Sequence, residues 1–200
     1  MAQRAAGRKT AILAADGFEE AELSSPKEAI AAAGGTVEVV SLKADDIQGF
    51  RHMETGRSIH VDHTPSDANP EDCDAVLIPG GLFNPDALRT DHDALQFAGA
   101  FVNHRKPVFA ICHGPQVLIS AGQVEGRTMT AVKSVRTDLA NPGATVTDAA
   151  VVVDHGLGTS RTPDDLPAFN ARIVEEICEG RARPAPHAFQ VGDDLKAATS

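Results

Sequence analysis

Short apolar runs separated by stretches of helical pattern constrain the fold of this chain more than any other feature. Thr10–Ala15, Ala75–Ile78 and Pro107–Ile111 each have the composition of a buried strand, and the second ends in Pro79-Gly80-Gly81. Strands of this kind that alternate with helices are typical of an α/β domain. We therefore predict a single doubly wound α/β domain, with a mainly parallel sheet and helices on both faces.

The remaining elements are expected to complete this pattern. Ser25 and Pro26 resemble an N-cap and a first helical position, so the first helix is predicted to start there. It is expected to end at Gly34-Gly35, and Asp16–Leu23 before it is expected to form an acidic turn. Residues 1–8 are predicted to form an N-terminal tail, 9–180 the domain and 181–200 a C-terminal tail or arm. The other expected strands and helices are Val37–Leu42, Arg57–Asp62, Asp91–His104, 114–122, Thr128–Val132, Ala149–Asp154 and Pro163–Glu179.

Charge and cysteine usage exclude several classes of function. The formal net charge is −10 and the basic residues form no run, which argues against nucleic acid or an anionic membrane as a partner. No apolar run approaches a membrane span, and 1–9 lacks the apolar core of a signal peptide. Cys73, Cys112 and Cys178 show no CxxC spacing, so we expect a cytoplasmic protein without a disulfide framework, metal or cofactor.

The segment around Cys112 carries the most specific chemical signal. Val108–Ile111 is a buried strand, and Gly114-Pro115 begins a helix directly behind the cysteine. A strand that turns sharply into a helix presents the residue at its apex as a nucleophile. The positive end of the helix is expected to lower the thiol pKa. Cys73 and Cys178 lack such a setting and are expected to be structural. His60 and His63, three residues apart on a strand, point to opposite faces and do not suggest a metal site.

This segment resembles a known family. Ala-Ile-Cys112-His113-Gly-Pro-Gln-Val-Leu is similar to the signature of the ThiJ/PfpI superfamily, whose fold is flavodoxin-like and shared with class I glutamine amidotransferases. Three further motifs occur in the same order, and they are Ala15–Glu22, Ile78–Gly81 and Val151–Leu166. The Cys-His-Gly-Pro sequence places the chain nearest the branch of PfpI-type intracellular peptidases and protein deglycases.

The resemblance implies a role for each matching residue. Cys112 matches the nucleophile, and Glu22 matches a carboxyl that bonds to its sulfur and whose pKa we expect to be raised. His113 matches a histidine that works with an acid from a neighbouring subunit, here Asp86, which makes a homodimer or larger homo-oligomer the expected unit. The amides of Gly80-Gly81 are expected to join that of His113 in an oxyanion hole.

Three functions remain open at this stage. The first is a stress-protective hydrolase of reactive carbonyls or their early adducts, and the second is an oligomer-dependent cysteine peptidase. The third is a redox-sensing or chaperone-like protein without turnover, because an exposed reactive thiol is oxidised first. PfpI-type peptidases can carry a tyrosine where this chain has Val132, which favours small carbonyl substrates over peptides. The class I glutamine amidotransferases need a His-x-Glu pair near the end of this domain. Pro163–Glu179 contains no histidine, so the resemblance to that family does not imply amidotransferase activity.

Overall fold

A six-stranded sheet forms the centre of the molecule. The computed structural model describes residues 4–180, and the strands of this sheet pair in parallel except for β10 and β11, which are antiparallel. The predicted doubly wound, mainly parallel α/β fold is thereby confirmed. In spatial order the strands are β10 (Val151–Asp154), β11 (Leu157–Ser160), β7 (Val108–Ile111), β6 (Ala75–Ile78), β1 (Lys9–Leu13) and β3 (Thr36–Val40).

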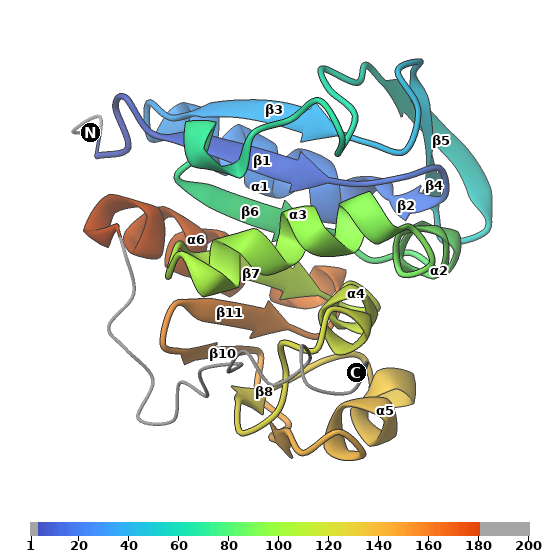
Figure 1. Ribbon diagram of the computed structural model, residues 1–200, viewed down its shortest axis with the longest axis vertical. Coiled ribbons are helices and arrows are strands. Elements are labelled where there is room, and N and C mark those ends of the chain that lie inside the picture. The colour runs from blue at the N-terminus through green and yellow to red at the C-terminus, as the bar shows by residue number, and fades with distance from the viewer. Residues whose placement is uncertain (1–3, 181–200) are drawn as a thin grey trace, which may run out of the picture.

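Helices cover both faces of the sheet (Figure 1). One face packs against α1 (Glu20–Ala32) and α6 (Leu166–Glu179), which also contact each other. The helices on the opposite face are α2 (Phe83–Leu88), α3 (His92–Asn103), α4 (Pro115–Ser120) and α5 (Arg136–Ala140). Three short 3-10 turns connect these elements, and they are η1 (Pro70–Asp72), η2 (Lys133–Val135) and η3 (Pro163–Asp165).

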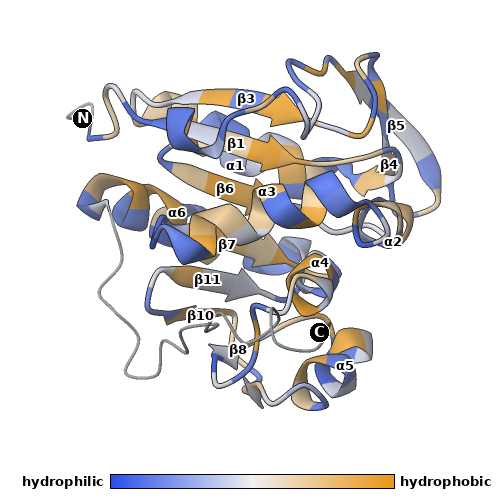
Figure 2. Ribbon diagram, in the orientation of Figure 1, coloured by the Kyte–Doolittle hydropathy of each residue, from blue (hydrophilic) through white to orange (hydrophobic). Residues whose placement is uncertain are grey.

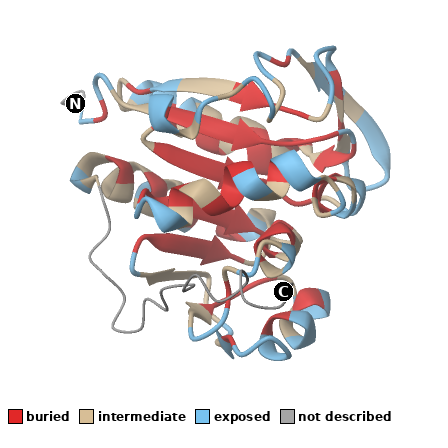
Figure 3. Ribbon diagram, in the orientation of Figure 1, coloured by how far each residue is buried: buried red, intermediate tan, exposed pale blue. Residues whose placement is uncertain are grey.

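The central strands are buried on both sides because their side chains alternate between two hydrophobic clusters. Along β7, Val108 and Ala110 face the α3 side, while Phe109 and Ile111 face the α6 side. The ring of Phe109 meets that of Phe169 edge-on, with centroids 6.3 Å apart. Strands β6 and β7 are largely orange in Figure 2 and red in Figure 3, so hydropathy and burial coincide there.

Two small sheets lie outside the central one. The larger contains β2 (Phe18–Glu19), β4 (Ile47–Arg51) and β5 (Glu54–Ile59), and the smaller contains β8 (Thr128–Met129) and β9 (Thr145–Val146). Glu20, at the start of α1, accepts a hydrogen bond from the Arg57 backbone N–H at 2.7 Å. It also pairs with the Arg51 and Arg57 side chains, each at 3.3 Å. These contacts attach the β4–β5 hairpin to the first turn of α1.

The predicted start of the first helix is wrong. Helix α1 begins at Glu20, and Pro26 lies inside it instead of at its first position. Proline removes one backbone donor, four residues after Glu22, yet the helix continues because its buried face, including Leu23 and Ile30, packs into the core. Glu22 therefore stands on a helix and not in an acidic turn.

Several boundaries also differ from the expectation. The expected strand at Arg57–Asp62 is β5, which ends at Ile59, and the one at Thr128–Val132 is only the two-residue β8. The expectation lacked β2, β4, β9, β11, α2 and α5. Ala5 is fully buried and its N–H donates to the Ala33 carbonyl, so packing begins before Lys9. The predicted arm at 181–200 lies outside the described residues. Within 4–180, no helix has the length and apolar character needed to cross a bilayer.

Candidate active site

Three connections at the carboxyl edge of the sheet bring the predicted site residues together. Cys112 and His113 follow β7, Gly80 and Gly81 follow β6, and Glu22 comes from the first turns of α1, after β1 and β2. In an open parallel sheet this edge is where ligands bind. The position of Gly80 shows how tightly the groups approach one another. A Cβ on Gly80 would lie 2.6 Å from Glu22 Oε2, 2.8 Å from Cys112 Cβ and 2.9 Å from the His113 amide nitrogen.

Cys112 occupies a strained turn between β7 and α4. Its φ is 60°, in the left-handed region that side chains other than glycine rarely adopt. Its N–H donates to the Ser160 carbonyl at 3.1 Å, which ties the turn to the neighbouring strand β11. Gly114 cannot be larger, because a Cβ there would lie 2.4 Å from the Ile78 carbonyl oxygen. The turn has the geometry expected of an elbow that presents a nucleophile.

Glu22 is a fully buried carboxyl beside the cysteine. Oε2 accepts a hydrogen bond from the Gly80 N–H at 2.7 Å, and Oε1 has no conventional hydrogen-bond partner among the described residues. Burial raises the pKa of Glu22 to about 8, against the lowering effect of the Gly80 amide and the Cys112 thiol. Glu22 therefore carries a proton at neutral pH, and the expected rise of its pKa is confirmed in direction, with burial as its main cause.

The expected lowering of the Cys112 pKa is wrong in direction. Burial raises the pKa of the thiol, and so does the charge of an ionised Glu22. The second cause disappears when Glu22 is protonated. The backbone N–H groups of His113 and Gly81 act in the opposite direction by donating to the sulfur. The Gly80 N–H, by contrast, is already bonded to Glu22, so Gly81 and His113 are the amides that face the sulfur.

His113 lies between the cysteine and a serine that the sequence analysis did not identify. Its Nδ1 is 3.2 Å from Cys112 Sγ, and its Nε2 is 3.3 Å from Ser134 Oγ. Burial lowers the pKa of the imidazole below its ordinary value of 6.5, so the ring is neutral at pH 7 and can accept a proton. Asp86 is exposed on α2, and no hydrogen bond or ion pair joins it to His113 within the described chain.

The other cysteines and histidines have ordinary surroundings. Cys73 is buried and its thiol donates to Glu38 at 2.9 Å, while Cys178 is half-buried against the α6 side of the core. His60 lies 3.2 Å from Asp46 at the surface. Among residues 4–180, no three side chains of metal-binding type lie close enough together to hold a metal ion.

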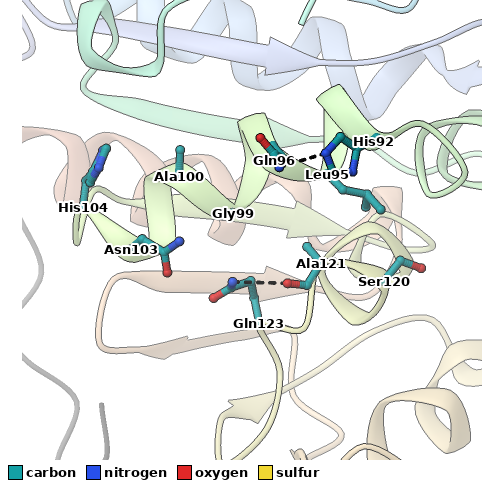
Figure 4. Close-up of a pocket in the computed structure, with 10 residues that line it drawn as sticks. All are labelled: His92, Leu95, Gln96, Gly99, Ala100, Asn103, His104, Ser120, Ala121 and Gln123. Carbon is teal, nitrogen blue, oxygen red and sulfur yellow. Dashed lines mark hydrogen bonds between the residues drawn. The ribbon is translucent and has the colours of Figure 1, made fainter. Parts of the chain in front are cut away.

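An open groove of about 480 Å³ lies between α3 and the end of α4 (Figure 4). None of the predicted site residues lines it. Its walls are neutral or polar, and His92 and Gln96 approach each other to 2.9 Å on the α3 side. The groove is therefore a surface separate from the Cys112 site. The residues lining it are His92, Leu95, Gln96, Gly99, Ala100, Asn103, His104, Ser120, Ala121 and Gln123.

The fold is doubly wound, a cysteine lies at a strand–helix elbow, and a buried carboxyl lies beside it. These features define a class of protein, which comparison with known sequences identifies. The DJ-1/PfpI family model matches residues 8–176. The chain belongs to the DJ-1/PfpI family. The resemblance seen in the sequence motifs is thereby confirmed.

Relatives and solved structures agree with this assignment. The Bacillus subtilis protein named "Putative cysteine protease YraA" is 48% identical over 163 residues, which is 82% of this chain and 94% of the relative. An uncharacterized protein of Staphylococcus saprophyticus is 49% identical over 172 residues, covering 85% of this chain and 98% of the relative. Drosophila melanogaster DJ-1beta superposes with a TM-score of 0.78 at 26% identity, covering 86% of this chain and 90% of that one.

A two-domain protein from Anabaena variabilis gives a further comparison. Its crystal structure contains DJ-1/ThiJ/PfpI-like and ferritin-like domains. The TM-score is 0.80 at 35% identity, over 84% of this chain and 47% of that chain. The fold described here is thus one that also occurs joined to a second domain.

Proposed function

We propose that this protein is a cysteine-dependent hydrolase of reactive carbonyl compounds, acting on small 2-oxoaldehydes or on their early adducts. The observation that carries the proposal is the buried, protonated Glu22 beside the Cys112 thiol. A thiol that adds to a carbonyl needs an acid to protonate the oxygen as its charge develops. Glu22 has that proton at neutral pH, and one of its oxygens has no conventional hydrogen-bond partner.

The first step forms a carbon–sulfur bond. The thiol proton moves to His113 Nδ1, 3.2 Å from the sulfur, while the sulfur attacks the aldehyde carbon. The electron pair of the broken π bond moves to the carbonyl oxygen, which takes the Glu22 proton. The amides of Gly81 and His113 face the sulfur, and they stabilise the negative charge that develops on the carbonyl oxygen. The product is a hemithioacetal on Cys112.

The later steps return every proton. Glu22, now a carboxylate, removes the hydrogen of the former aldehyde carbon as a proton, and the neighbouring ketone oxygen takes one from His113, which gives an enediol. Glu22 then protonates the second carbon, and His113 takes the hydroxyl proton from the first, leaving a 2-hydroxy thioester. Water adds to this thioester and gives one of its protons to the Glu22 carboxylate, the carbon–sulfur bond breaks, and the sulfur recovers its proton from His113. A 2-hydroxy acid leaves.

Release of lactate from methylglyoxal tests the proposal. Cys112→Ser is expected to lose more than about 1000-fold in kcat/KM, because it lacks the nucleophile. The matched control is Cys178→Ser, which removes a half-buried thiol on α6 and should stay within about 2-fold of the wild type. Equal lactate release by the wild type and Cys112→Ser would exclude the proposal.

A cysteine peptidase is the second candidate, and two observations favour it. A neutral imidazole lies 3.2 Å from the thiol, the arrangement of a nucleophile and its base. In addition, the relative YraA carries the name of a cysteine protease. Hydrolysis of fluorogenic peptides by the wild type, and its loss in Cys112→Ser, would support this function. Peptide turnover that Cys112→Ser retains would argue against it.

A second copy of the chain is the partner that we propose for the surface around α2. Leu82 and Phe83 are 60% and 64% exposed, and the Phe83 ring lies 6.4 Å from that of Phe50. Exposed apolar side chains that cluster in this way mark interaction surfaces. Asp86 lies on the same helix, so this contact would carry the predicted acid to the interface. Sedimentation should show a dimer or larger assembly in the wild type and a monomer in the double variant Leu82→Ser/Phe83→Ser.

A further inference from the structure

The short turn η2 lies directly across the Cys112–His113 peptide. The Val132 N–H donates to the Cys112 carbonyl at 3.3 Å, and the Val135 N–H donates back to the Val132 carbonyl at 3.0 Å. These two bonds place Ser134, the middle residue of η2, over the imidazole of His113. The serine is 21 positions from the histidine in the chain, so the contact exists only in the folded protein.

The residue after η2 fixes this turn to the rest of the domain. Arg136 Nε donates to the Ala131 carbonyl at 3.2 Å, and its Nη2 donates to Asp148 at 2.7 Å. Arg161, which follows β11, bonds to the same Asp148 oxygen at 2.8 Å. Ser134 is thus an exposed side chain on a backbone that is held on both sides. A hydroxyl on such a backbone can orient a neighbouring ring without a large entropy cost.

The two contacts of His113 select one tautomer. The thiol can give its proton only to a ring nitrogen with a free lone pair, and Nδ1 is the nitrogen that faces Cys112 Sγ. The ring proton must then be on Nε2, where Ser134 Oγ is placed to accept it at 3.3 Å. Nε2–H donation to Ser134 and thiol donation to Nδ1 therefore favour each other.

We propose that Ser134 is a positioning residue, which holds the His113 imidazole with its proton on Nε2 and its lone pair toward the Cys112 thiol. The proposal rests on the proposed cysteine chemistry of this site. It assigns to a residue of the same chain the orienting role that the sequence motifs suggested for Asp86 of a neighbouring copy.

A neutral hydroxyl has a different effect from a carboxylate at this position. Among the described residues, the imidazole contacts the Cys112 thiol and the Ser134 hydroxyl, and burial, with no charged neighbour, is the cause of its pKa shift. A carboxylate on Nε2 would stabilise the imidazolium, whereas a serine leaves the ring neutral and able to accept a proton at pH 7. This agrees with the lowered pKa of His113, which its burial causes.

The tautomer can be measured directly by ¹⁵N NMR of the His113 ring, independently of any turnover. The wild type should show the Nε2–H form, Ser134→Ala a mixture of both tautomers, and Ser134→Thr the wild-type form, because threonine retains the hydroxyl. The matched control is Ser66→Ala, which removes another exposed hydroxyl, one that contacts Thr64. An unchanged tautomer ratio in Ser134→Ala would overturn the proposal.

Kinetics with methylglyoxal provide the second measurement. Ser134→Ala should lower kcat about 10-fold with KM within about 2-fold, and Ser134→Thr should recover most of that loss, since orientation of a base is one part of the 10²–10⁴-fold that general-base catalysis contributes. Asp86→Asn distinguishes the two possible orienting groups. A tautomer change in Asp86→Asn but not in Ser134→Ala would assign the role to the partner's carboxylate and overturn the proposal. If the wild type shows no Cys112-dependent turnover, the proposed function fails while the NMR measurement still decides the role of Ser134.

Discussion

Replacement of Glu22 by glutamine should flatten the dependence of stability on pH. Glu22 has a pKa of about 8 in the folded protein, against an ordinary value of 4.5. Between these values the unfolded chain has released the proton that the folded chain still holds. The free energy of unfolding therefore falls as pH rises through this range. Below about pH 4.5 the carboxyl is protonated in both states, and this destabilisation is absent. Glutamine has nearly the same shape, carries no charge, and can still accept the Gly80 hydrogen bond.

The size of the effect follows from the two pKa values. The interval is about 3.5 pH units, and one unit corresponds to about 1.36 kcal/mol, so ionisation of Glu22 costs the fold up to about 5 kcal/mol above pH 8. By pH 7 the loss relative to acid pH is about 3 kcal/mol. The burial of Glu22 is complete, so solvent screening does not reduce this figure greatly.

Urea denaturation at pH 5, 6, 7 and 8 measures this directly. The free energy of unfolding of the wild type should fall by about 2.5 kcal/mol more between pH 5 and 7 than that of Glu22→Gln. Glu28→Gln is the matched control, because Glu28 lies exposed on the same helix and its replacement should leave the wild-type slope unchanged. Parallel pH profiles for the wild type and Glu22→Gln would show that the carboxyl ionises normally and would refute the reasoning.

Three further predictions test the packing and the reactivity of the site. Gly80→Ala should abolish turnover and lower Tm, because its Cβ would overlap the buried Glu22 carboxyl at 2.6 Å. The control Gly99→Ala on α3 has room for a Cβ, and a thermal melt should show a gain of up to about 1 kcal/mol in the free energy of unfolding. Phe109→Ala should reduce the free energy of unfolding by about 3–5 kcal/mol in urea, since the ring is fully buried, and a loss below 1 kcal/mol would contradict the description of the core. Mild peroxide should modify Cys112 before Cys73 in mass spectra, because Cys112 is half-buried and Cys73 is 2% exposed; equal modification would count against a reactive thiol at this turn.

The strands of the central sheet were predictable where composition alone encodes burial. β1, β6 and β7 are short apolar runs, and such runs have few stable arrangements other than the middle of a sheet. β11 was missed because its glycine reads as a turn. The structure gives the reason for that glycine, since a Cβ on Gly158 would lie 2.8 Å from the Phe109 ring. Gly158 thus makes the strand hard to recognise in the sequence, and it also allows β11 to pack against Phe109.

The site was predictable only in part, for a related reason. Cys112 and His113 are adjacent in sequence, so their motif could be recognised, and Glu22 followed from the family resemblance. Ser134 has no local signal, because the turn that carries it reaches His113 only through tertiary contacts. The direction of the Cys112 pKa shift was also missed, since it depends on burial and on the neighbouring carboxyl, which a helix N-terminus alone does not reveal.

The backbone conformation at Cys112 gives the site a cost in folding stability. A φ of 60° costs any residue with a side chain on the order of 1 kcal/mol relative to glycine. Cysteine is therefore not the residue that folding alone would select at 112, just as glutamate is not the one it would select at 22. A laboratory selection for thermal stability with no demand on activity should drift toward glycine and glutamine at these positions. Such a selection would erase the site while leaving the sheet and its helices intact.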